Sequence, residues 1–187
     1  MKRFTSNIFP AVLLMGCFFL ASCENDPVAI KRMTEKKTAV EEARDIVTYM
    51  SQDSKIKAKL TAPFMLRYLA DPPYVEFPKT LHVDFYNDTM AMESQVDARY
   101  GKYREWEKKV FLRDSVVVMN KLNGDTLRTD ELWWDQQTEK FYTTKAVAIH
   151  TRDKVFYGIG MEASQNFDWW VLTQASGRVT VPKDSFP

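Results

Sequence analysis

The sequence contains little cysteine, histidine and glycine, and this scarcity excludes several classes of function. Among 187 residues there are two Cys, two His and six Gly. A four-ligand zinc site would need all the Cys and His together, or acidic residues in addition. Neither a Gly-rich phosphate-binding pattern nor the Gly-x-Ser-x-Gly motif of hydrolases occurs. We therefore expect neither an enzyme nor a bound metal or other cofactor.

The chain also lacks an excess of charge of either sign. It has 26 Lys and Arg against 25 Asp and Glu, a formal net charge of +1. Binding of nucleic acid requires a basic face that neutralises phosphates, so this class of partner is not expected. Aromatic residues make up 13% of the chain, which favours β-structure or a large apolar surface.

The first residues have the features of a bacterial targeting segment. A cationic pair, Lys2-Arg3, precedes an apolar stretch, Ile8 to Leu20. This stretch is shorter than the roughly 20 apolar residues of a membrane-spanning helix. It ends in Leu20-Ala21-Ser22-Cys23, which resembles the lipobox of bacterial lipoproteins. We predict a signal peptide over residues 1–22 and a lipid anchor on Cys23; an uncleaved anchor and an ordinary secretory signal are the alternatives.

Cleavage after residue 22 would change the chemistry that remains. Cys17 would leave with the signal peptide and Cys23 would carry lipid, so no thiol would be left for a disulfide, a metal or a nucleophile. Residues 23–42 are polar and mixed in charge, which predicts a tether. Residues 43–187 are then the folded domain, which is long enough to form a hydrophobic core without disulfides.

From Ile46 onward apolar and polar residues alternate, which is typical of β-strands with one buried face. Asp53-Ser54 and Asn123-Gly124-Asp125 separate alternating segments and predict hairpin turns. Pro72-Pro73 and Pro78 predict an irregular connection, because proline is not tolerated in a central strand. No convincing helical periodicity follows residue 50, and the sequence predicts an antiparallel all-β domain.

A weaker signal is a repeat of about 31 residues, the length of one pair of strands. Val116-x-Val118, Val147-x-Ile149 and Val179-x-Val181 follow one another near this spacing, and Val110, Phe141 and Leu172 precede them. Chance similarity between alternating strands is the alternative. If the repeat is real, each pair of strands buries its apolar face by stacking on the next.

An anchor segment, a tether and repeated hairpins in this order resemble the LptC family of lipopolysaccharide export. The segments that carry the resemblance are Ser54-Lys55-Ile56-Lys57-Ala58, Val75-Glu76-Phe77, Phe111 to Val118, Gly124 to Asp130, Gly158 to Ala163 and Gly177-Arg178-Val179. The chain departs from the enterobacterial form in two respects. It has a lipobox in place of a transmembrane helix, and Asp114 in place of a glycine.

The resemblance implies an open twisted β-jellyroll, similar to the bridge protein LptA. It implies a lipid-binding periplasmic protein that accepts lipopolysaccharide from an inner-membrane ABC transporter and passes it to an LptA-like bridge protein, in assembly of the outer membrane. Acyl chains of lipid A would lie in a groove between two sheets. The candidate lining is Ile56, Ala58, Leu60, Leu81, Val83, Phe85, Val116, Val118, Leu132, Trp134, Phe141, Val147 and Ile149.

The resemblance also implies docking through the edges of the sheet. The strand region Arg178, Val179, Thr180 and Val181 would pair with the bridge protein, and Ala43 to Met50 would face the transporter. The lipid on Cys23 would hold the protein at a membrane of a Gram-negative cell, the inner membrane being the expectation.

Several alternatives stay open at this point. Each candidate could be an ordinary core residue instead of a residue that lines a lipid groove. Whether the interior is closed or open decides between these two alternatives. The protein could instead be a periplasmic or surface lipoprotein whose β-sandwich binds protein or glycan. His82 and His150 are expected at the surface or rim. Trp133-Trp134 and Trp169-Trp170 are expected to place one indole on each face of a strand, as core-plus-surface packing or as an aromatic rim.

Overall fold

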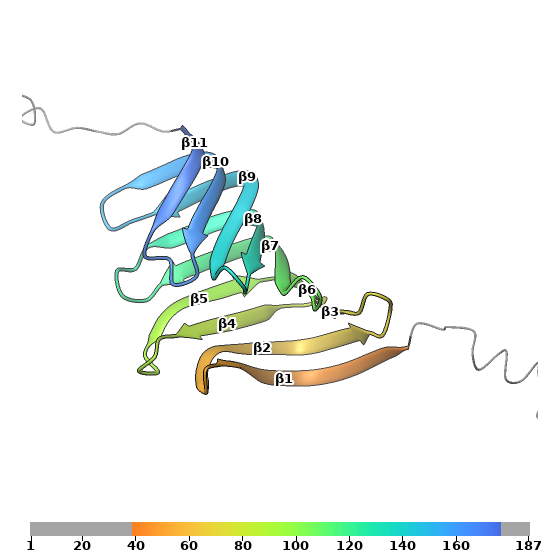
Figure 1. Ribbon diagram of the computed structural model, residues 1–187. Helices are drawn as coiled ribbons and strands as arrows, with labels where there is room; N and C mark the ends of the chain where they lie inside the picture. Colours follow the sequence, from red (N-terminus) through yellow and green to blue (C-terminus); the bar gives the residue numbers. More distant parts are fainter. Residues whose placement is uncertain (1–38, 177–187) are drawn as a thin grey trace, which may run out of the picture. The chain divides into compact units, whose positions relative to one another are not determined.

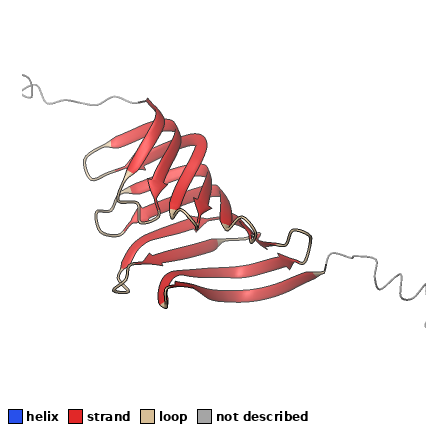
Figure 2. Cartoon of the chain, viewed as in Figure 1, coloured by secondary structure: helices blue, strands red, loops and turns tan. Residues whose placement is uncertain are grey.

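The computed structural model describes residues 39–176, which form eleven β-strands and contain no helix (Figure 2). The strands are β1 (Val40–Gln52), β2 (Lys55–Tyr68), β3 (Tyr74–Phe77), β4 (Leu81–Tyr86), β5 (Met92–Ala98), β6 (Tyr100–Arg104), β7 (Lys109–Asn120), β8 (Thr126–Asp135), β9 (Lys140–His150), β10 (Val155–Ser164) and β11 (Trp170–Ser176). The predicted all-β fold is confirmed.

The strands form one antiparallel sheet in which each long strand pairs with the next along the chain (Figure 1). β3 and β4 are two parts of one such strand, interrupted at residues 78–80. Both parts pair with β2: Val75 faces Arg67, and His82 faces Thr61. β5 and β6 are likewise two parts of one strand, interrupted at Arg99, and both pair with β7. The sheet is therefore a meander of long strands.

Most of the long strands are bent or interrupted near the middle, and these positions form a line across the sheet that we call the bend row. Asp45, Asp114 and Ser115 have positive φ angles of 51°, 65° and 59°. The register shifts between Arg113 and Val116 in β7, and again between Ile159 and Met161 in β10. The bend row comprises Asp45, Pro63, residues 78–80, Arg99, Asp114, Ser115, Asp130, Lys145 and Gly160.

The bend row divides the sheet into two halves that face each other. Half A comprises β4, β5 and residues 116–120, 126–129 and 147–150; half B comprises β3, β6 and residues 109–113, 131–135 and 140–143. The ring of Phe85 in half A lies 4.9 Å from the ring of Trp134 and 5.8 Å from that of Phe141, both in half B. The apolar faces of the two halves thus enclose one interior.

The 31-residue repeat is visible in β7 and β9. Val110, Leu112, Val116 and Val118 are the buried apolar residues of β7. The corresponding residues of β9, Phe141, Thr143, Val147 and Ile149, are also buried, and three exposed residues separate the two pairs in each strand. Leu172 is half-buried in β11. Val179 and Val181 lie outside the described residues.

The two predicted hairpin turns are present. Asp53 and Ser54 both have positive φ, as a two-residue turn of type I′ requires, and Gly124 has a φ of 82° in the β7–β8 turn. Three details differ from the expectation. β3 forms between Pro73 and Pro78 and pairs with both β2 and β6, because the prolines lie just outside the strand and leave its backbone donors intact. β1 begins at Val40, ahead of the boundary expected at residue 43. Trp169 precedes β11 and is not part of a strand.

Candidate functional site

The predicted lining residues lie together in the interior between the two halves. Ile56 is half-buried. The other twelve are at most 7% exposed and belong to one hydrophobic cluster. Alternation along each strand placed them correctly on the inner face, since successive side chains of a strand point to opposite sides. The interior is filled by these side chains, so they form the core of the domain in this structure.

The same cluster contains apolar residues that the sequence did not assign to the lining: Ala62, Val75, Phe77, Val96, Ala98, Val110, Leu112, Leu127, Met161, Ala163 and Phe167. Most of them alternate with polar neighbours, so the same pattern could have found them. Phe167 is different, because it lies in the connection between β10 and β11, where no periodicity exists. Its burial could not be read from the sequence.

Polar groups are confined to the margins of this interior. The buried polar residues of the described part are Asp84, Ser94, Asn120, Thr129, Asp135 and Thr143. Within residues 39–176, each buried side-chain nitrogen or oxygen has a hydrogen-bond partner. The middle of the interior is therefore apolar, and a hydrocarbon chain placed there would leave no polar group unsatisfied.

Hollows of about 500, 650 and 400 Å³ lie along the bend row. The first has apolar walls that include Ala62, Leu81 and Ala98 from the interior, and charged residues at its rim. Ser115 lines all three hollows, because the bend of β7 lies where they meet. At the bend row the first hollow thus reaches side chains of the interior.

His82 lies at the rim of the first hollow, between two carboxylates. Its Nδ1 is 2.7 Å from Oδ1 of Asp97 on β5, and its Nε2 is 2.8 Å from Oδ1 of Asp84. Partial burial disfavours the charged imidazolium, but the bonds to Asp97 and Asp84 outweigh it and raise the pKa of His82 above 6.5. The imidazolium joins β4 to β5 as an ion-paired link. The expected rim position of His82 is confirmed, and His150 is exposed.

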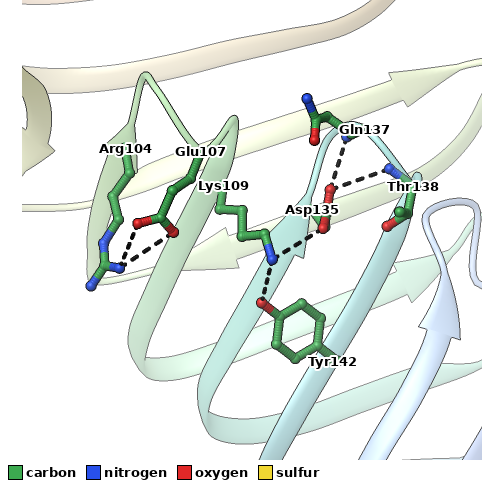
Figure 3. A network of polar contacts seen from close by, with 7 residues as sticks. All are labelled: Arg104, Glu107, Lys109, Asp135, Gln137, Thr138 and Tyr142. Carbon is green, nitrogen blue, oxygen red and sulfur yellow. Dashed lines mark hydrogen bonds and ion pairs between the residues drawn. The ribbon is translucent and has the colours of Figure 1, made fainter.

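The ends of the strands opposite the bend row are fixed by polar networks (Figure 3). Asp135 accepts hydrogen bonds from the backbone N–H groups of Gln137 and Thr138 at 2.9 and 3.2 Å, and pairs with Lys109 at 3.3 Å. Burial would raise the pKa of Asp135, but these bonds lower it overall. The carboxylate thereby fixes the turn between β8 and β9. Tyr142 lies on the other side of Lys109, with its hydroxyl 3.4 Å from Nζ.

Comparison with known protein families decides what kind of protein this is. A family model described as "Lipopolysaccharide-assembly, LptC-related" matches residues 11–168. The chain belongs to the LptC family. As an LptC-family protein it is a periplasmic, inner-membrane-associated component of lipopolysaccharide transport, and the family serves in transport rather than catalysis. A comparison with curated proteins gives no match.

The described domain of this LptC-family protein contains no group of three or more His, Cys, Asp or Glu placed to hold a metal ion. In residues 39–176 we also find no helix long and apolar enough to cross a membrane. The predicted anchor Cys23 and the predicted partner strand Arg178–Val181 lie outside the described residues.

Both outer strands of the LptC-family sheet have one edge that no other strand among residues 39–176 covers. β1 pairs only with β2 over its whole length, and β11 pairs only with β10. Val47 and Tyr49 of β1 and Val171 of β11 are more than half exposed. Uncovered backbone donors and acceptors at such an edge can accept an added strand.

Proposed function

We propose that this LptC-family protein accepts lipopolysaccharide from an inner-membrane ABC transporter and passes it to an LptA-like bridge protein, with the acyl chains covered by the jellyroll interior. The apolar interior enclosed by halves A and B is the observation that carries the proposal. Each buried CH2 group contributes roughly 0.8 kcal/mol, so several acyl chains would bind tightly without ionic contacts.

The filled interior sets a condition on this function. Acyl chains can be accommodated only if halves A and B move apart or side chains such as Phe85 and Trp134 are displaced. The two halves are connected through the bend row, where positive-φ residues and strand interruptions replace regular pairing. We propose that the halves hinge there, while pairing within each half is kept.

We further propose that the two outer strands serve different partners. Ala43 to Met50 of β1 would receive the transporter, and Arg178, Val179, Thr180 and Val181 would pair with the bridge protein. The uncovered edges of β1 and β11 support strand addition at both ends of the sheet. Cleavage after residue 22 and lipidation of Cys23 would keep the domain at the inner membrane.

The interior can be tested with a photoreactive amino acid at Val83 or Val118 of the full chain in cells. Both side chains are buried in half A, and we expect each position to capture lipopolysaccharide. Val117 is the matched control, since it is adjacent to Val118 but points to the opposite face. Mass spectrometry of lipid co-purified with the unsubstituted chain provides a second readout. Absence of lipopolysaccharide in both assays would reject the proposal and favour a generic binding lipoprotein.

The assignment of the partner edge is tested separately by deletion of residues 178–187. The shortened protein should still capture lipopolysaccharide at Val118 but lose binding to the bridge protein. If binding to the bridge protein survived, Arg178–Val181 would not be the docking strand.

A further inference from the structure

The connection between β10 and β11, residues 165–169, reaches across the side of the domain opposite the bend row. We call this connection the clasp and this side the mouth. In half A, the hydroxyl of Ser94 donates a hydrogen bond to the backbone oxygen of Gln165 at 2.7 Å. Nδ2 of Asn120 donates to the backbone oxygens of Asn166 and Phe167 at 3.1 and 3.2 Å. The clasp is thus held by the end of β7 and the start of β5.

The clasp is also held by half B. Nε1 of Trp134 donates a hydrogen bond to Oε1 of Gln165 at 2.8 Å. The backbone N–H of Gln165 donates to the backbone oxygen of Glu139 at 2.8 Å, in the turn that Asp135 fixes. A single connection therefore ties together the strand ends of both halves, which are not paired with each other there.

Phe167 closes the interior at the clasp. Its side chain is fully buried in the same hydrophobic cluster as the lining residues. Its φ of 56° lies in the left-handed region, which residues with a Cβ adopt at an energetic cost. Burial of the ring offsets this cost only while the clasp is in place. The ring occupies apolar space that a hydrocarbon chain could fill equally well.

A polar hollow of about 450 Å³ lies at the mouth, bordered by the clasp and by the strand ends of half A. Its walls include Lys57, Asp88, Glu139, Asp168 and Trp169. Hydrogen bonds from Lys55 and Lys57 lower the pKa of Asp88 to about 2, so this carboxylate stays ionised. Carboxylates, amides and an exposed indole suit the hydroxyl groups of a saccharide. The residues on either side of Phe167 thus line the polar hollow, while its own ring is buried in the apolar interior.

We propose that the clasp is the entrance for lipid, and that a fatty acyl chain of a glycolipid takes the place of the Phe167 ring when the clasp opens. The saccharide headgroup then occupies the hollow at the mouth. This inference rests on the proposed function and adds the position at which the lipid passes into the interior. The hydrogen bonds of Ser94, Asn120 and Trp134 determine how readily that position opens.

Hydrogen exchange of the full chain with and without lipid A tests the clasp directly. Lipid A should speed exchange in residues 165–169 by about tenfold, because opening breaks the bond from Gln165 to Glu139. Exchange in β4 and β5 should change little. Binding of lipid A with unchanged protection of the clasp would overturn the inference and leave the proposed function intact.

A pair of substitutions tests whether the clasp limits uptake. Ser94→Ala with Asn120→Asp removes the donors from half A, while Asp keeps the acceptor that Leu122 and Asn123 use. Association of fluorescent lipid A should become about tenfold faster, even though the unfolding midpoint falls.

Tyr100→Phe is the matched control, because it removes the hydrogen bond from the Tyr100 hydroxyl to Oε1 of Glu76, which joins β6 to β3 within half B and touches neither the hinge nor the clasp. It should lower the midpoint but leave the association rate within about twofold. Equal acceleration in both variants, or none in the first, would overturn the inference. If no form of the protein bound lipid A, the proposed function itself would fail.

Discussion

At the scale of single residues, the ion-paired His82 makes stability depend on pH. The bonds to Asp97 and Asp84 raise its pKa in the folded protein. Its contribution is therefore fully present below the ordinary histidine pKa of about 6.5, and is lost as the pH rises through the folded value. His82→Gln should reduce the free energy of unfolding most below about pH 6 and less in alkaline solution, as measured by urea unfolding.

The second histidine provides the control for this prediction. His150 is exposed at the end of β9 and makes no ion pair among the described residues, so His150→Gln should leave the free energy of unfolding nearly unchanged. A loss of stability in His82→Gln that was the same at acidic and alkaline pH would contradict the role of the imidazolium. In that case the side chain would contribute through packing alone.

The tandem tryptophans show what alternation predicts for single residues and where it fails. Trp134 is buried in the interior, and Trp133 lies on the outer face with Phe111 and Tyr142 at ring-centroid distances of 4.9 and 6.3 Å. The expected placement of one indole on each face is confirmed for this pair. The same reasoning does not apply to Trp169, because it lies in the clasp and not in a strand.

At the scale of elements, the bend in a strand such as β7 allows its two ends to belong to half A and half B. Asp114 lies at a φ of 65°, in the left-handed region, where a side chain destabilises the backbone and glycine does not. Asp114→Gly should therefore raise the free energy of unfolding by about 0.5–1 kcal/mol in urea titrations. The ion pair lost with Arg113 is exposed and contributes little.

Lys145 is the matched control because it occupies the corresponding position of the repeat, in β9, without a positive φ. Lys145→Gly should lower the free energy of unfolding by roughly 0.5–1 kcal/mol. Lys145 has no positive φ whose strain glycine could relieve, and glycine loses more backbone entropy on folding than lysine does. Destabilisation by Asp114→Gly of the same size would show that the β7 bend is not strained.

At the scale of the whole described domain, stability should fall from the middle of the sheet toward its outer strands. β4, β5 and β7 are paired on both sides and contribute fully buried residues such as Phe85 and Val118. β1 is largely exposed and paired on one side among residues 39–176. Backbone amides of β1 and β11 should exchange about 100-fold faster than those of β4 and β5 in the full chain, as measured by mass spectrometry.

This gradient bears on the proposed docking. Strands that open readily at the edges can exchange partners without unfolding of the interior. Exchange in β1 as slow as in β4 would mean that the edge is already a rigid template, and strand addition would then require no local opening.

The sequence by itself determined the strands, their hairpins and the inner face of each. A period of two assigned residues such as Val83 and Val118 to the interior, and turn residues such as Asn123-Gly124 determined where the chain reverses. These are local properties, because side-chain direction and turn geometry depend on neighbouring residues only. The cationic, apolar and lipobox features of residues 1–23 are local in the same sense and remain a prediction.

Only the tertiary structure decided which faces meet. The contact of Phe85 with Trp134 and the burial of Phe167 join residues far apart in the chain, and depend on how much each strand bends. The alternation within one strand does not encode these long-range contacts. For this reason the alternation predicted an apolar interior, whereas the closure of that interior by the clasp became visible only in the folded domain.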